Sequence, residues 1–188
     1  MGTTLSLHAN AVPSDWVRRW THLIPAGERV LDLACGHGRH MQWLQLQGFQ
    51  CLGVDRDPVA LQTAAGFGEV VSADLENQPW PLGGQSFAAV VVTNYLWRSL
   101  WTDLLALLQP GGVLIYETFA IGNASVGKPS NPDFLLRHGE LLEVCRGLRV
   151  LAYEDGVCLQ PERFVQRIVA VNAPLDDGET PLRYLLPN

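Results

Sequence analysis

The stretch Val30–His40, VLDLACGHGRH, places an acidic residue inside an apolar run and follows that run with a loop containing two glycines. Continuous apolar runs of this length are typical of parallel-sheet strands that are buried on both faces. Gly36 and Gly38 allow the backbone to turn sharply and to approach a ligand closely. The stretch therefore predicts a buried strand, a ligand-binding loop and a helix that begins near Arg39.

The remaining chain alternates strands and helices around this unit. Further apolar runs predict strands at 51–55, 70–75, 87–94 and 113–119, and helical patterns fall at 13–23, 39–47, 58–66 and 98–108. This alternation is the pattern of an α/β fold in which helices cover both faces of a mostly parallel sheet. After a Gly, Ser, Asn and Pro-rich loop at 120–133 and a helix at 134–145, the runs 148–154 and 164–172 have no helix between them. We therefore expect a doubly wound, Rossmann-like sheet of about seven strands with an antiparallel edge.

Length and composition set the class of protein. The 188 residues, 47% of them hydrophobic, suit a single globular domain, which we divide into an N-terminal helical segment (1–28), a cofactor-binding half (29–119) and a substrate-side half (120–188). With a net charge of −6 and a single lysine, the chain lacks the basic surface of most nucleic-acid-binding proteins. We expect a cytoplasmic protein with no membrane segment and no nucleic-acid partner. We also expect no metal, because His37 and His40 lack a third ligand nearby.

Polar residues lie at or near the ends of the five predicted parallel strands, and these ends meet at one edge of the sheet. Each residue alone could cap the following helix, but as a set they predict a binding site. They are Asp32, Asp55, Asp74, Asn94 and Glu117. An acid at the end of the second strand is placed to hold ribose hydroxyls, so the ligand is expected to contain a nucleoside. Met41 occupies the position of the third glycine in the dinucleotide fingerprint, which counts against a nicotinamide cofactor.

With these motifs the sequence resembles the class I S-adenosylmethionine-dependent methyltransferases. VLDLACGHG resembles their first motif, LGVDRDP their second-strand acidic motif, SADLE their third-strand motif, and LQPGGVLIYETF their turn into the fifth strand. The sequence departs from the family pattern at Ala34 and Arg39, where glycine is common. The resemblance implies the class I methyltransferase fold and S-adenosyl-L-methionine as cofactor.

The resemblance also implies a role for each matching residue. Asp32 and the loop of Ala34, Gly36 and Gly38 would hold the methionine end of the cofactor. Asp55 would bind the ribose and Arg56 would line the adenosine pocket. Asp74 and the Leu75 backbone would meet the adenine, and Asn94 would lie under the sulfonium.

The substrate side is predicted less specifically. Asn94 and Tyr95 follow the fourth strand without the N/D-P-P-Y/F signature of enzymes that methylate nucleic-acid amines. Residues 127–141 resemble a segment of small bacterial methyltransferases grouped with the tellurite-resistance enzymes, which favours a small-molecule acceptor. Glu117 is either a catalytic carboxylate or a structural acid, and Trp16 and Trp20 either cover the site or pack on the sheet.

We therefore expect a methyltransferase acting on a small molecule, with Asn94, Tyr95 and Glu117 as candidate catalytic residues. Three alternatives stay open. They are methyl transfer to a protein or RNA, a nicotinamide-dependent oxidoreductase, and a non-catalytic protein that binds the cofactor. The pattern does not indicate an oligomeric state.

Overall fold

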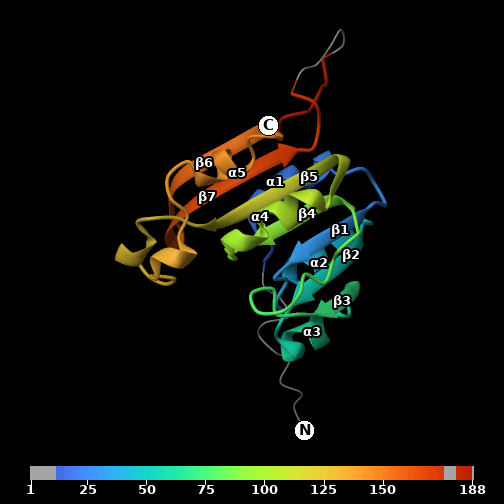
Figure 1. Ribbon diagram of the computed structural model, residues 1–188, viewed down its shortest axis with the longest axis horizontal. Helices are drawn as coiled ribbons and strands as arrows, with labels where there is room; N and C mark the ends of the chain where they lie inside the picture. Colours follow the sequence, from blue (N-terminus) through green and yellow to red (C-terminus); the bar gives the residue numbers. More distant parts are fainter. Residues whose placement is uncertain (1–11, 176–180, 188) are drawn as a thin grey trace.

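A computed structural model describes residues 12–175 and 181–187. Its centre is a seven-stranded sheet in the order β3-β2-β1-β4-β5-β7-β6 (Figure 1). The strands are β1 (Arg29–Leu33), β2 (Gln50–Asp55), β3 (Glu69–Ser72), β4 (Phe87–Thr93), β5 (Leu108–Phe119), β6 (Arg149–Leu159) and β7 (Glu162–Val171). All neighbouring pairs from β3 to β5 are parallel, and β7 runs antiparallel to both β5 and β6. The predicted fold class is confirmed.

Helices cover both faces of the sheet. They are α1 (Asp15–Trp20), α2 (Arg39–Leu46), α3 (Pro58–Ala64), α4 (Trp101–Ala106) and α5 (Glu140–Val144). One core cluster joins the sheet to α1, α2 and α3, and a second joins the opposite face to α4 and α5. Every residue of β4 is buried, as expected of a central strand with helices on both faces.

The N-terminal helix α1 is capped by Ser14. The Ser14 hydroxyl accepts a hydrogen bond from the Trp16 amide and caps α1, which a 3₁₀ turn, η1 (Thr21–Leu23), extends. Trp16 and Trp20 are 2% and 3% exposed and belong to the core cluster on this face of the sheet. They pack on the sheet, which is the second of the two predicted arrangements. No helix in the described ranges is long and apolar enough to cross a membrane.

Several element boundaries differ from the sequence prediction, most clearly those of β3, β5, β6 and β7. β3 ends at Ser72, because Asp74 accepts the Glu76 amide and closes a turn there. The strand β5 begins at Leu108, before the Pro-Gly-Gly turn, and its pairing with β4 is interrupted by a register shift. The hairpin strands β6 and β7 are longer than predicted, at Arg149–Leu159 and Glu162–Val171.

The predicted helix at 134–145 is the largest discrepancy. Only Glu140–Val144 is α-helical, after the short 3₁₀ turns η3 (Asn123–Ser125) and η4 (Pro132–Phe134). Leu136 is fully buried and extended, because its amide donates to the Phe119 carbonyl and its carbonyl accepts the Ile121 amide. Pairing with the chain that leaves β5 therefore replaces the first part of the predicted helix.

Candidate active site

The loop after β1 is held in place by the acid at the end of β2. The Gly36 amide donates to Asp55 Oδ2 at 2.8 Å, and the Asp57 amide donates to Asp55 Oδ1 at 2.9 Å. Gly36 and Gly38 have positive φ values of 54° and 78°. A Cβ on Gly38 would lie 2.9 Å from Ala64 Cα, so glycine there also allows α2 to begin against α3. These backbone conformations agree with the sharp turn predicted for the loop.

Ala34 carries the strain that glycine would avoid. Its φ is 56°, in the left-handed region that costs an L-residue with a side chain about 1–2 kcal/mol. Glycine is common at this position in the family pattern that the sequence resembles, and the positive φ of Ala34 is a conformation that favours glycine. Ala34 nevertheless lines the pocket described below.

Asp32 is a buried carboxylate with an unused oxygen. Its side chain is 1% exposed, and Oδ2 has no hydrogen-bond partner among the described residues. Burial raises the pKa of Asp32 to about 7, against the lowering effect of Arg39 nearby. The unpaired oxygen beneath the glycine loop would be satisfied by a cationic ligand group such as an ammonium.

His40 connects Asp32 to the N-terminal helix. Its Nε2 accepts the Ser14 amide at 3.2 Å, so the ring proton lies on Nδ1, which is 3.8 Å from Asp32 Oδ2 and 3.5 Å from Thr93 Oγ1. Burial and the charge of Arg39 lower the pKa of His40 to about 3. The imidazole is therefore neutral and acts as a fixed polar bridge.

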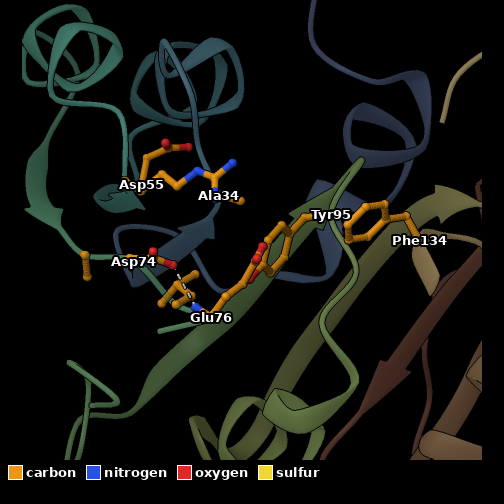
Figure 2. Close-up of a pocket in the computed structure, with 9 residues that line it drawn as sticks. Ala34, Asp55, Asp74, Glu76, Tyr95 and Phe134 are labelled. Atoms are coloured by element: carbon orange, nitrogen blue, oxygen red, sulfur yellow. Dashed lines mark hydrogen bonds between the residues drawn. The ribbon is translucent and has the colours of Figure 1, made fainter. Parts of the chain in front are cut away.

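A pocket of about 260 Å³ lies beyond the carboxyl ends of β1, β2 and β3 (Figure 2). Six residues predicted for the site line it, namely Ala34, Asp55, Arg56, Asp74, Leu75 and Tyr95. Asp74 also accepts the Asn77 side-chain amide and the Glu76 amide, and these hydrogen bonds lower its pKa. The sheet edge thus brings together the residues that were expected to surround an adenosine.

A second pocket of about 250 Å³ adjoins the first. Asn94 and Tyr95 line it together with Leu96, Thr118 and Phe119. The two pockets share three lining residues, Glu76, Tyr95 and Phe134. Figure 2 shows Tyr95 between the other two, so this side chain forms a boundary between the cavities. Asn94 has a φ of 55°, a conformation that asparagine tolerates better than most residues.

The Tyr95 backbone carbonyl is held by a hydrogen bond, whereas the Tyr95 hydroxyl forms none with the described residues. The buried Tyr116 donates its hydroxyl to the Tyr95 carbonyl at 2.7 Å. The Tyr95 hydroxyl itself is buried without a hydrogen-bond partner in the described part of the chain. Burial, and then the charges of Glu76 and Asp74, raise the pKa of Tyr95 well above its ordinary value. The hydroxyl is therefore neutral and available to a ligand.

Glu117 lies at the same sheet edge but lines neither pocket. It is fully buried on the α1 face of the sheet, where Ser14 Oγ donates to its Oε1 at 3.0 Å. Arg167 and Arg163 approach its carboxylate at 2.5 and 3.6 Å. These contacts give Glu117 a structural explanation, and its catalytic role stays a prediction.

Several pocket residues were not predicted, among them Glu76 and Phe134, which line both pockets. Glu76 directly follows the Asp74-Leu75 pair in the third-strand motif, so its position beside the adenosine residues was a usable signal. Phe134 carried no such signal, because it reaches the pocket through the fold of residues 120–136. Arg98 fixes that segment by donating to the Asp133 and Leu135 carbonyls at 2.7 and 2.9 Å.

The site has the donors and acceptors that S-adenosylmethionine requires. The unpaired Oδ2 of Asp32 suits the ammonium of its methionine part, whereas the Gly36 and Gly38 amides already donate to Asp55 and to the Cys35 carbonyl. Asp55 lies where ribose hydroxyls can donate to it, and Asp74 and Leu75 lie where an adenine can bind. When bound, this cofactor supplies an electrophilic methyl group on a sulfonium.

The chain matches known methyltransferases in sequence and in fold. Residues 30–112 match the family model described as a methyltransferase domain. TehB from Haemophilus influenzae superposes with a TM-score of 0.70 at 19% identity, over 88% of this chain and 64% of TehB, so the chain spans less than two thirds of that protein. A TehB-like enzyme from Corynebacterium glutamicum gives a TM-score of 0.62 at 22% identity, over 87% of this chain and 90% of its own.

An S-adenosylmethionine-dependent methyltransferase from Mesorhizobium loti gives a TM-score of 0.63 at 18% identity, over 81% of this chain and 95% of its own. No curated protein sequence matches the chain. The structural likenesses show the fold, and the family match covers less than half of the chain. The chain therefore has the fold of these S-adenosylmethionine-dependent methyltransferases, and its residues 30–112 are similar to a methyltransferase domain.

Proposed function

We propose that the protein transfers a methyl group from S-adenosylmethionine to a small-molecule acceptor. The observation that supports the small acceptor is the second pocket, which adjoins the cofactor pocket and measures about 250 Å³. Pockets for drug-sized ligands usually measure about 300–1,000 Å³, so this one suits a molecule of one ring or a short chain.

The chain's own residues supply binding and alignment. Asp32 would hold the methionine end of the cofactor and Asp55 its ribose, on either side of the glycine loop. Tyr95 lines both pockets and Asn94 lines the second one, and we assign them to orienting the reacting atoms. Methyl transfer to an aligned nucleophile depends mainly on such positioning and on the exclusion of water.

Release of S-adenosylhomocysteine tests this proposal. Purified protein with S-adenosylmethionine is incubated with small-molecule extract fractions from cells, or with the protein and RNA fractions of the same cells. We expect release with the small-molecule fractions, and lower release by Asn94→Ala, which shortens a side chain that lines the second pocket. Release that depends only on protein or RNA would show that the acceptor is a macromolecule.

A further inference from the structure

The second pocket carries a charge pattern that selects among small acceptors. Resting on the proposed function, we infer that the acceptor is a small amine, which enters the pocket as a cation beside Glu76 and the aromatic ring of Tyr95. The pocket lining, the unused polar atoms and the position of the nearby arginines support this assignment.

Among the charged residues that line the two adjoining pockets, carboxylates outnumber cations. Glu76 borders both, and Asp55 and Asp74 line the cofactor side. Among the described residues that line either pocket, Arg56 is the only Lys, Arg or His, and it lies on the cofactor side. An anionic acceptor would therefore enter against uncompensated negative charge, whereas a cation would be attracted.

Glu76 is available for such a contact. It is half-buried, and its backbone amide is fixed by Asp74 Oδ1 at 3.0 Å. Its carboxylate forms no ion pair with the described residues 12–175 and 181–187. A partly desolvated carboxylate without a cationic partner is costly unless a ligand provides one.

The aromatic residues complete a cation site. Tyr95, Phe119 and Phe134 line the second pocket, and a cation over an aromatic face gains about 0.5–2 kcal/mol. The Tyr95 hydroxyl, buried without a partner in the described residues, can accept a hydrogen bond from an ammonium. Figure 2 shows Tyr95 extending toward Glu76 in the first pocket, and both residues also line the second pocket.

Two arginines of β7 do not reverse this charge pattern. Arg163 and Arg167 both point to the Glu117 carboxylate, on the face of the sheet that α1 covers. Arg167 also pairs with Glu154 at 3.1 Å and stacks over Trp16. These guanidinium groups are paired with acids and do not line the second pocket.

The chemistry balances with an amine. The ammonium first gives a proton to Glu76, which passes it to water, and the free amine nitrogen then has a lone pair. That lone pair forms the new bond to the methyl carbon as the bond from this carbon to sulfur breaks, and the bonding electrons remain on sulfur. A primary or secondary amine finally releases one further proton to Glu76 or water, whereas a tertiary amine becomes a quaternary ammonium.

Ligand-observed NMR titration of the protein saturated with S-adenosylhomocysteine tests the inference without requiring turnover. The probes are benzylamine, N,N-dimethylbenzylamine, histamine and tyramine, with benzyl alcohol and benzoate as neutral and anionic controls. We expect at least one amine to bind tenfold or more tightly than both controls. Glu76→Gln should remove this preference, and Glu69→Gln should keep it, because Glu69 is an exposed acid on β3 whose partner is Arg29.

The outcomes separate this inference from the proposed function. If S-adenosylhomocysteine itself does not bind, the proposed function fails. If it binds but none of the four amines binds, or benzoate binds as tightly as the best amine, the amine assignment fails and the methyltransferase assignment stands. Amine binding that is unchanged in Glu76→Gln would also overturn the inference.

Discussion

Asp32 is a carboxylate that the fold buries before any ligand arrives. Its Oδ2 has no hydrogen-bond partner among the described residues, and Nδ1 of the neutral His40 ring lies 3.8 Å from it. The folded protein therefore holds a proton on Asp32 more tightly than the unfolded chain does. Burial of the charged carboxylate lowers the free energy of unfolding, and a cationic group of the cofactor bound at Oδ2 would offset this cost.

Asp32→Asn should make the ligand-free protein more stable at pH 8. The folded pKa of about 7 lies above the ordinary value of 3.8, so the stability from this group is present below pH 3.8 and is lost as the pH rises through 7. Asparagine removes that loss, so the variant should have the higher Tm at pH 8 and little advantage at pH 4. Thermal denaturation at both pH values measures this, and an equal Tm difference at the two would contradict it.

Glu117→Gln distinguishes the structural from the catalytic role of this acid. Removing the charge leaves Arg163 and Arg167, whose side chains are 23% and 17% exposed, without their shared buried partner. We expect a loss of about 3 kcal/mol in the free energy of unfolding, with the affinity for S-adenosylhomocysteine unchanged.

Glu154→Gln is the matched control for this substitution. Glu154 also pairs with Arg167 but its side chain is 45% exposed, so we expect a loss below about 1 kcal/mol. Chemical denaturation measures both variants. A Glu117→Gln protein of unchanged stability that has lost its turnover would instead establish the catalytic role.

At the scale of elements, the segment between β5 and α5 depends on one arginine. Arg98 forms a two-pronged ion pair with Glu140, with N–O distances of 2.6 and 2.9 Å, and also donates to the carbonyls on either side of Phe134. Glu140 is 3% exposed. Burial alone would raise the pKa of Glu140, but the hydrogen bonds from Arg98 and from the Arg137 amide lower it below its usual value.

Arg98→Met should loosen this segment and destabilise the protein. It removes the closer of the two arginines that pair with the buried Glu140 carboxylate, and breaking a buried pair costs about 3–5 kcal/mol. We expect a lower Tm and faster amide hydrogen exchange across residues 131–137. Arg137→Met is the matched control, because Arg137 pairs with the same carboxylate through a side chain that is 67% exposed. Equal effects of the two substitutions would show that Arg98 has no special role.

The sequence predicted the strands better than the segments between them. The apolar runs of β1, β2 and β4 are buried on both faces, so their positions depend on composition alone. The helix predicted at 134–145 is wrong over its first part, for a reason that lies outside this segment. Leu136 belongs to the helical pattern locally, but its hydrogen bonds are made with Phe119 and Ile121, which lie far away in the sequence. Such long-range pairing overrides local helical preference, and no local pattern reports it.

At the scale of the molecule, the candidate site was predictable where it follows from sheet topology. Strand ends meet at one edge, so Asp55, Asp74 and Tyr95 could be grouped from their places in the strand order. Phe134 could not, because a loop brings it to the pocket. The sequence also placed Glu117 at the correct edge but could not show on which face its side chain lies or that two arginines of β7 enclose it.

The first pocket is the proposed cofactor site, and calorimetric titration with S-adenosylhomocysteine tests this assignment most directly. The wild-type protein should bind one equivalent with micromolar or tighter affinity and should not bind NADH. In Asp55→Asn the ribose loses its charged acceptor, so the affinity should fall about tenfold or more. Saturable binding of NADH, or an S-adenosylhomocysteine affinity that is unchanged in a folded Asp55→Asn protein, would contradict the account.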